Sequence, residues 1–275
     1  MTNKEPTQNF IIQMIKNAGS LTLEYFNKSL NIKEKTENQG IVTDADLASE
    51  NLIKSEIHRH FPEHSILAEE SGLSEFKQLD NHQPLWIIDP LDGTTNFSKR
   101  NPYYCISIAF GYLINKRFHA KMGAIYQPTT SSLYFAEKNK GVYFNDTQIH
   151  ISELSEMKMA SICTGFSSNK GKQLIPLKNT IAEIQNECLG LRINGAAALD
   201  LAHTAKGIFQ GFYETPLAPW DTAAGALLIE ESGGKVTNFY GEPFCPIHDR
   251  GIIATSPQLY DKLFQLIQIH YKNTN

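Results

Sequence analysis

Apolar residues recur every three or four positions in six stretches of the chain, which predicts six amphipathic or buried helices. These stretches are 10–21, 44–57, 174–188, 196–207, 221–234 and 259–267. The second helix is expected to begin at an N-cap formed by Thr43 or Asp44 and to end before the next proline. Asp221 is expected to cap the fifth helix, which a pair of glycines terminates. The polar residues 33–40 are expected to form a loop.

Alternation of large and small side chains predicts strands between these helices. Every second residue between 104 and 110 is large, which is typical of a strand. The segments 122–128, 132–138 and 141–146 follow with turn residues between them and predict an antiparallel meander. Shorter runs predict further strands at 65–72, 85–88, 160–166, 209–214 and 251–256. The mixture predicts an α/β (α+β) fold of layered sheets and helices.

Size, charge and cysteine content narrow the class of protein. A chain of 275 residues is long for one compact unit, so we expect two closely packed subdomains, 1–150 and 151–275. The net charge of −4 argues against nucleic acid or an anionic membrane as a general partner. The longest apolar run, 104–114, is too short to span a bilayer. The four cysteines form no CxxC pair, and no secretory signal is evident, so a cytoplasmic protein with reduced thiols is expected.

The segment 85–97, LWIIDPLDGTTNF, places two carboxylates where a buried strand is expected to end. Asp89 and Asp92 flank Pro90, which cannot donate to a ladder and is expected to terminate the strand. Like charges this close raise each other's pKa unless a cation lies between them. The carboxylates and the Leu91 carbonyl offer only oxygen ligands, which suit Mg²⁺ better than zinc or copper. A magnesium site is one interpretation, and a plain Asp-Gly turn is the other.

The residues after these aspartates extend the magnesium interpretation. Gly93 lets the backbone approach a ligand closely. A helix that starts at 94–97 would present free N–H groups and its dipole to an anion such as phosphate. A threonine hydroxyl there could orient a water molecule. A metal beside an anion-binding helix start is an arrangement suited to phosphoryl transfer to water.

Further acids lie at the ends of other predicted elements. Glu69 and Glu70 close the strand at 65–72, Asp46 lies at the start of the second helix, and Asp221 opens the fifth. Each also has an ordinary interpretation, as a helix cap or as a solvated charge at the end of a strand. From these residues alone, both interpretations stay open.

The order of several segments resembles that of the inositol monophosphatase family. The segments are GIVTDAD (40–46), AEESG (68–72), WIIDPLDGTTNF (86–97), GAAALDLAHTAKG (195–207) and PWDTAAGALLIEESGG (219–234). The resemblance runs from about residue 10 to about residue 260. It implies the αβαβα sandwich shared with fructose-1,6-bisphosphatases, Mg²⁺-dependent hydrolysis of phosphate monoesters, inhibition by Li⁺, and a homodimer.

By position, the resemblance implies two Mg²⁺ sites that share one carboxylate. Their ligands would be Glu69, Asp89 and the Leu91 carbonyl for the first ion, and Asp89, Asp92 and Asp221 for the second. A third, weaker ion would lie near Glu69, with Asp46 reaching it through water. Two or three ions are therefore expected in the active site.

The resemblance also implies where a small phosphate ester would bind and react. The phosphate would meet Gly93, Thr94 and Thr95, and the alcohol part would be lined by Asp92, Gly195, Ala197, Glu214 and Asp221. Glu69 and the Thr94 hydroxyl would position a metal-bound water for in-line attack, and Asp46 would assist. Ala196 stands where relatives commonly have Thr or Ser, which leaves the alcohol preference open.

Two alternatives to an inositol-1-monophosphatase-type enzyme remain. The same chemistry could act on fructose 1,6-bisphosphate, a nucleotide such as 3′-phosphoadenosine 5′-phosphate, NADP or histidinol phosphate. The TTNF ending favours the inositol branch over the nucleotide branch, in which Lys typically follows DGT. Alternatively, the chain could be a regulatory protein that keeps the fold and binds a protein or RNA partner. Because every implied ligand position is filled, a purely non-catalytic role is the weaker hypothesis.

The other polar side chains that stand out in the sequence are expected to have ordinary structural roles. These are a solvated helix end for His58, His60 and His64, local helix contacts for Asp200 and His203, a surface or interface ion pair for Arg192, and a polar loop for Lys170 and Lys172. The alternatives are a contact with phosphate or with a dimer partner for Arg192, and a metal site, the less favoured interpretation, for the three histidines.

Overall fold

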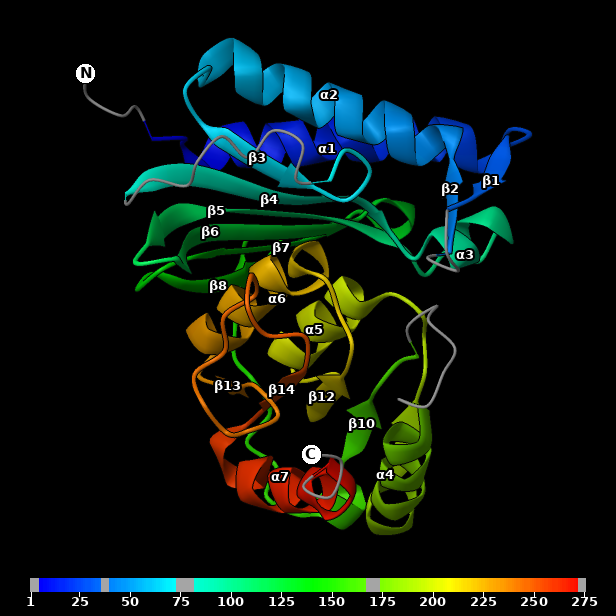
Figure 1. The fold of residues 1–275 in the computed structure, drawn as a ribbon, viewed down its shortest axis with the longest axis vertical. Helices are drawn as coiled ribbons and strands as arrows, with labels where there is room; N and C mark the ends of the chain where they lie inside the picture. Colours follow the sequence, from blue (N-terminus) through cyan, green and yellow to red (C-terminus); the bar gives the residue numbers. More distant parts are fainter. Residues whose placement is uncertain (1–4, 36–39, 73–81, 167–173, 272–275) are drawn as a thin grey trace.

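Five layers build the molecule in the computed structural model, which describes residues 5–35, 40–72, 82–166 and 174–271. A pair of helices covers a seven-stranded sheet, a second pair lies between that sheet and a five-stranded one, and a third pair covers the far face (Figure 1). This αβαβα order confirms the predicted layered fold. Among the helices of the described residues, none combines the length and apolar content needed to cross a bilayer.

The larger sheet is the predicted meander with one parallel strand added at its edge. Its order is β3 (Ser65–Ala68), β4 (Gln83–Asp92), β5 (Cys105–Ile114), β6 (Arg117–Gln127), β7 (Ser132–Glu137), β8 (Gly141–Phe144) and β9 (Thr147–Ile149). Only β3 and β4 run parallel, while the remaining neighbours are antiparallel. Both faces of β4 and β5 are buried because helices cover the sheet on each side.

The smaller sheet has the order β11 (Gly190–Arg192), β10 (Ser161–Cys163), β12 (Gly211–Glu214), β14 (Ile252–Thr255) and β13 (Lys235–Thr237). Strands were predicted at the positions of β10, β12 and β14. The edge strands β11 and β13 were not predicted.

Six helices of the described residues fall in the predicted stretches, and a seventh, short helix begins at Thr94, where a helix start was considered. They are α1 (Gln8–Phe26), α2 (Asp44–His60), α3 (Thr94–Ser98), α4 (Leu174–Glu187), α5 (Ala197–Ala205), α6 (Pro219–Glu231) and α7 (Pro257–Tyr271). Helix α1 buries Ile11, Met14, Ile15 and Ala18, as its stripe predicts. Helix α6 is instead apolar nearly all round, because it lies between the two sheets.

Thr43 is the N-cap of α2, which is one of the two predicted alternatives. Two other predicted boundaries were wrong. Helix α6 begins at Pro219 with Ala218 as its N-cap residue, so Asp221 is the third residue of the helix and not its cap. The predicted loop at 33–40 includes the end of a short strand, β1 (Ile32–Glu34), which pairs with β2 (Ile41–Thr43). Positions 36–39 of that loop lie outside the described residues, as do Lys170 and Lys172.

We propose that the chain divides into subdomains near residue 150. The strands of the larger sheet all lie before that point and those of the smaller sheet after it. One hydrophobic cluster nevertheless contains buried residues of both halves, such as Ile87 and Leu228. The two halves therefore share a core through the central helix layer.

His64 is not the solvated residue that the sequence predicts. Its side chain is 8% exposed and stacks between Phe61 and Phe110, with ring centroids 4.8 Å and 5.5 Å away. Its Nδ1 accepts a hydrogen bond from Trp86 Nε1 at 3.0 Å. Burial lowers the pKa of His64 from 6.5 to about 4, because the charged form loses its hydration. The imidazole is thus a neutral component of the aromatic core.

Substituting His64 with Gln should flatten the acid dependence of stability. The unfolded chain binds a proton near pH 6.5 and the folded chain does not, so stability falls as the pH drops from 6.5 towards 4. Between pH 7.5 and 5, wild type should lose up to about 2 kcal/mol more unfolding free energy than His64→Gln. Urea denaturation at both pH values measures this difference. Equal losses in the two proteins would contradict the assignment.

Candidate metal centre and active site

The ends of the parallel strands β3 and β4 bring the first carboxylates together. Glu69 follows β3, and its N–H donates to the Ile88 carbonyl of β4 at 3.2 Å. Asp89 and Asp92 pair with Ser107 and Cys105 of β5, so three steps along β4 match two steps along β5. This bulge turns both aspartates to the same side of the sheet, whereas an odd spacing in a regular strand would separate them.

Pro90 therefore does not end the strand as predicted. It lies within β4, inside the irregular stretch between Asp89 and Asp92. A proline is tolerated at a bulge because the ladder is already interrupted there. The Asp89 carboxylate uses the same irregularity, since its Oδ1 accepts the Leu91 N–H at 3.0 Å.

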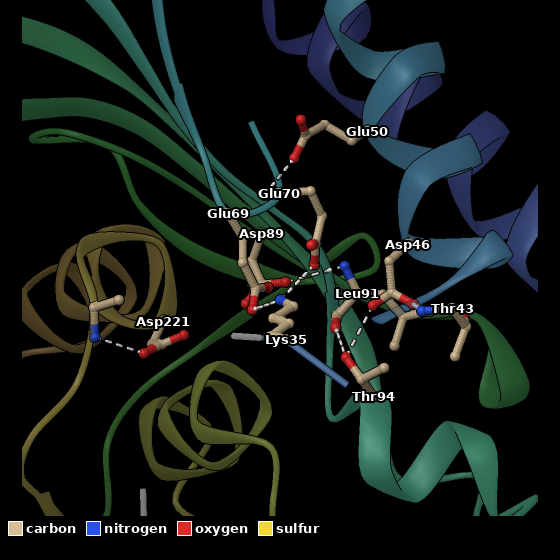
Figure 2. A network of polar contacts seen from close by, with 11 residues as sticks. Lys35, Thr43, Asp46, Glu50, Glu69, Glu70, Asp89, Leu91, Thr94 and Asp221 are labelled. Carbon is tan, nitrogen blue, oxygen red and sulfur yellow. Dashed lines mark hydrogen bonds and ion pairs between the residues drawn. The ribbon is translucent and has the colours of Figure 1, made fainter. Parts of the chain in front are cut away.

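A fourth carboxylate comes from the central helix layer. Asp221 lies in the first turn of α6, and its Oδ2 accepts the Ala218 N–H at 2.7 Å. Figure 2 shows its side chain directed towards Glu69 and Asp89 from the opposite side of the site. Burial raises the pKa of Asp89 well above its ordinary value, and the charges of Glu69, Asp92 and Asp221 raise it further. Asp89 is 1% exposed, so it is an acid whose ionised form needs a nearby cation.

Lys35 supplies a cation from the chain itself. Its Nζ lies 2.8 Å from Glu69 Oε1 and 2.6 Å from Glu70 Oε1 (Figure 2). Burial lowers the pKa of Lys35, but the attraction of Glu69 and Glu70 outweighs it, so the pKa lies above its ordinary value. Glu70 is further held because its N–H donates to Glu50 Oε2 at 2.8 Å. Because Lys35 binds both glutamates, this contact does not distinguish Glu69 from Glu70 as the metal ligand.

The ligand atoms are of the kind that a divalent cation binds, although the side chains do not surround one common position. All the converging groups are oxygens, as Mg²⁺ requires. Among the described residues, no group of three or more His, Cys, Asp or Glu side chains is arranged to hold a metal ion as it stands. Lys35 is bound to Glu69 and would have to release it. Asp89 and Asp221 are buried and form no ion pair with a cation among the described residues, and this observation favours a metal.

Asp46 positions Thr94 instead of facing the acids directly. Its Oδ2 accepts hydrogen bonds from the N–H and hydroxyl of Thr43 at 2.8 Å and 2.5 Å. Its Oδ1 accepts the Thr94 hydroxyl at 2.9 Å, and that hydroxyl also lies 3.2 Å from the Leu91 carbonyl (Figure 2). Burial raises the pKa of Asp46 to about 6, partly offset by the bonds to Thr43 and Thr94. Asp46 therefore links the start of α2 to the start of α3.

The turn before α3 packs directly on the loop before α5. Gly93 has a φ of +91°, and a Cβ there would lie 3.1 Å from the Tyr103 carbonyl and 3.2 Å from Ala196 Cβ. The Asn96 amide donates to the carbonyls of Tyr103 and Asn194, both at 2.8 Å. Asn96 was not predicted as a functional residue, yet it joins the proposed phosphate turn to the proposed alcohol pocket.

Gly195, Ala197, Glu214, Asp92 and Asp221 do gather around one cavity of about 750 Å³, as the resemblance implies. Asp92 Oδ2 accepts the Ala198 N–H at 2.8 Å and so caps α5. Within the described structure, Ala196 provides no side-chain cap of its own. Burial raises the pKa of Asp92 to about 7. Burial also raises the pKa of Glu214, as do the neighbouring charges, of which Asp221 contributes most. Thr95, by contrast, is exposed beside the turn.

A buried polar network supports the alcohol side of the cavity. The Tyr103 hydroxyl donates to Asp200, lies 3.1 Å from His203 Nδ1, and Asn194 Nδ2 donates to Asp200 at 2.7 Å. These contacts agree with a structural function for Asp200 and His203. Arg192 forms no ion pair with any described residue; its guanidinium donates to the Leu191 carbonyl at 3.0 Å.

The position of Lys35 was missed because no local pattern marks it. The predicted loop around it gave no reason to place its ammonium beside Glu69, which is 34 residues further along the chain. Only the pairing of β1 with β2 brings it there. Asn96 was missed for the same reason, since its partner carbonyl at Asn194 is 98 residues away.

Replacing Lys35 with Met should strengthen the response to Mg²⁺. Without metal, the variant should be less stable than wild type, because Glu69 and Glu70 lose their counter-ion. With saturating Mg²⁺, its melting temperature should rise by at least about 2 °C more than that of wild type, because no ammonium competes for Glu69. Differential scanning calorimetry with and without Mg²⁺ measures both effects. Lys54→Met is the matched control, because Lys54 contacts Glu50 and Ser71 instead. Equal metal-induced shifts in the three proteins would refute the competition.

Comparison with known proteins places the chain in one family. The model of the inositol monophosphatase family matches residues 3–272. The Nus factor SuhB of Escherichia coli K12 is 34% identical over 238 residues, which cover 86% of each chain. The inositol monophosphatase structure from Anabaena has a TM-score of 0.82 and 35% identity, and covers 95% of each chain. A third structure, an IMPase/NADP phosphatase complexed with Mg²⁺ and phosphate, shares the fold with a TM-score of 0.80 at 24% identity, covering 97% of this chain and 95% of its own.

The family match spans nearly the whole chain. The Anabaena structure has the same fold, and its sequence identity of 35% indicates common family membership as well as a common fold. The segments that carry the carboxylates lie inside the matched range. The chain belongs to the inositol monophosphatase family.

Proposed function

We propose that the chain is a Mg²⁺-dependent phosphatase that hydrolyses small phosphate monoesters, with myo-inositol monophosphate as its substrate. The observation that carries this proposal is the convergence of buried carboxylates from β4 and α6 beside the start of α3. Such a cluster is costly for the fold alone, because each acid destabilises the ionised form of its neighbours. Family membership supports the same conclusion.

Two or three Mg²⁺ ions would be held by Glu69, Asp89, the Leu91 carbonyl, Asp92 and Asp221. When bound, Mg²⁺ would neutralise the charge on the phosphate and on the departing alcohol oxygen. The structural neighbour that holds Mg²⁺ and phosphate supports this choice of ion. The resemblance also implies inhibition by Li⁺, which the same assay can measure.

The protein's own residues would bind and orient the reactants. Because the Thr94 hydroxyl donates its proton to Asp46, its oxygen is free to accept a hydrogen bond from a water molecule. Glu69, on the other side, can accept the second proton of that water once Lys35 has released it. The first-turn N–H groups of Thr94 and Thr95 have no partner within α3 and would bind the phosphate oxygens.

The alcohol would enter the part of the cavity near Glu214 and Ala197. The Glu214 carboxylate is buried and accepts no hydrogen bond from the described residues. Carboxylates accept hydrogen bonds from hydroxyl groups, so an acidic wall suits a polyol. Ala196, which lacks a hydroxyl, leaves the binding of the alcohol to the carboxylates of Asp92, Glu214 and Asp221.

Replacing Asp89 with Asn should lower hydrolysis by at least about a thousandfold, because the central acid of the metal site loses its charge. Phosphate release from myo-inositol 1-phosphate, with Mg²⁺ and with a chelator, is the measurement. The metal-free stability of Asp89→Asn should equal or exceed that of wild type, because charge repulsion is relieved. Asp261→Asn, at an exposed position on α7, is the control. Near wild-type hydrolysis by Asp89→Asn would refute the proposed site.

We also propose a homodimer formed through the free edge of the smaller sheet. Strand β11 is an edge strand, and Leu189, Ile193 and the neighbouring Met159 are exposed apolar side chains, Leu189 by 62%. Exposed apolar residues on an edge strand are typical of an interface. Light scattering should give a dimer for wild type and a monomer for Leu189→Glu. Tyr240→Glu, at a site that is 74% exposed, should stay dimeric; a monomeric wild type would exclude this interface.

We propose that the protein is located in the cytoplasm. Cys105, Cys163, Cys188 and Cys245 are all free thiols. Free thiols are usual in reducing compartments. Cell fractionation tests the proposal, and recovery of the protein outside the cytoplasm would contradict it.

The names of two relatives favour a second function. The Escherichia coli relative is the Nus factor SuhB, and the Neisseria meningitidis relative is named a putative Nus factor SuhB. A regulatory function through a protein or RNA partner could accompany the phosphatase activity or replace it. Capture of a stoichiometric partner, together with undetectable phosphate release, would favour the regulatory function alone. Normal turnover in the Asp89 assay would exclude a purely regulatory protein.

A further inference from the structure

Four residues close a ring of hydrogen bonds beside the active-site cavity. Asn96 and Tyr103 belong to the first half of the chain, and Asn194 and Asp200 belong to the second. The Asn96 amide donates to the carbonyls of Tyr103 and Asn194, both at 2.8 Å. The Tyr103 hydroxyl and the Asn194 amide both donate to Asp200 Oδ1, the amide at 2.7 Å. The Asn96–Asn194 and Tyr103–Asp200 bonds therefore join the two halves.

The acid in this ring is expensive for the fold. Asp200 is 1% exposed, and among the described residues no cationic side chain forms an ion pair with it. Its donors are a neutral hydroxyl and a neutral amide. A buried carboxylate without a cation lowers stability, whereas the buried neighbours Leu199 and Leu201 raise it. A polar group that costs stability is expected where function requires it.

The ring adjoins the two surfaces that the proposed function brings together. Asn96 lies in α3, and the proposed phosphate turn is the start of that helix. Asn194 directly precedes residues 195–197, which line the cavity. The two surfaces touch, since a Cβ on Gly93 would lie only 3.2 Å from Ala196 Cβ. A change in the ring would therefore shift one surface against the other.

We infer that Asp200 is a positioning residue, which closes the ring and so holds the wall that binds the alcohol at a fixed distance from the turn that binds the phosphate. This inference rests on the proposed function, which assigns those two tasks to the wall and the turn. Without the Asp200 oxygen, Tyr103 and Asn194 lose the acceptor that they share. The Asp92 bond to Ala198 remains, so α5 keeps its cap while the loop before it is released.

Two substitutions at position 200 separate the acceptor oxygen from the charge. Asp200→Leu removes both, whereas Asp200→Asn removes the charge and keeps an oxygen that accepts both hydrogen bonds. The distinction matters because the charge of Asp200 also raises the pKa of Asp92. Asp200→Leu should lower kcat/KM for myo-inositol 1-phosphate at least about tenfold, because small displacements of bound groups slow a reaction strongly. Asp200→Asn should stay within about twofold of wild type.

A second ester distinguishes positioning from a general loss of structure. Phenyl phosphate has no hydroxyl group for the acidic wall, so Asp200→Leu should lower its kcat/KM by less than about twofold. Tyr103→Phe removes one bond of the ring and should show the same selectivity to a smaller extent, which also provides the test if Asp200→Leu does not fold. Equal losses for the two esters would refute the inference, and so would an equal loss in Asp200→Asn and Asp200→Leu.

Thr204→Val is the matched control. The Thr204 hydroxyl donates to the Asp200 carbonyl at 2.8 Å within α5 and is buried, but it is not part of the ring. The control loses a buried hydrogen bond of the same helix, and its ratio of kcat/KM for the two esters should equal that of wild type. A change of this ratio as large as that in Asp200→Leu would show that any disturbance of α5 suffices, which would contradict the inference.

Binding separates this inference from the proposed function. Calorimetry in Mg²⁺ with the phosphonate analogue of myo-inositol 1-phosphate, and with inorganic phosphate, needs no turnover. Wild type should bind the analogue at least about tenfold more tightly than Asp200→Leu does, and the two should bind phosphate equally. If wild type hydrolyses neither ester but this difference is found, the positioning stands and the phosphatase proposal fails. Equal affinities for the analogue would refute the positioning even if both esters are hydrolysed.

Discussion

Repulsion among buried carboxylates is the constraint on which the rest of the structure depends. Asp89 lies at the centre, and Glu69, Asp92 and Asp221 each raise its pKa. Carboxylates that are buried and this close together tend to move apart or to become protonated. The fold opposes separation because the acids sit on rigid elements: β4 is buried in the seven-stranded sheet, and α6 is packed between the two sheets. The stability of these elements is therefore what allows a charged site to exist.

Hydrogen bonds and one ion pair offset the repulsion among these carboxylates. Asp221 and Asp92 each accept a backbone N–H from the first turn of a helix, and Asp89 accepts the N–H of Leu91. Lys35 neutralises the charge of Glu69, whose side chain is partly exposed. A helix N-terminus and an ammonium group both stabilise a carboxylate in its ionised form. These contacts hold the carboxylates in place and direct them to one region, where a divalent cation could bind them.

The sequence predicted the layered fold and the segments that carry the acids, because both depend on local pattern. The strand segments that lead to Asp89 and Glu69 are visible as apolar runs followed by charge. What could not be predicted depends on contacts between distant segments. Lys35 reaches Glu69 only through the pairing of β1 with β2, and Asn96 donates to the carbonyl of Asn194 in a loop of the other half. Pro90 was misjudged because a proline rule for regular strands does not hold at a bulge.

Asp92 caps α5 although the two belong to opposite halves of the chain. Where Ala196 offers no side-chain oxygen, the helix takes its cap from a strand that lies more than a hundred residues earlier. Exchange of the second half with that of a relative, by recombination or by construction of a chimera, would keep both sheets but would join two surfaces that had not been selected together. A half that carries Thr or Ser at this position would bring its own cap and release Asp92 from that duty. The residue at position 196 therefore decides how far the second half of the chain depends on the first for the cap of α5.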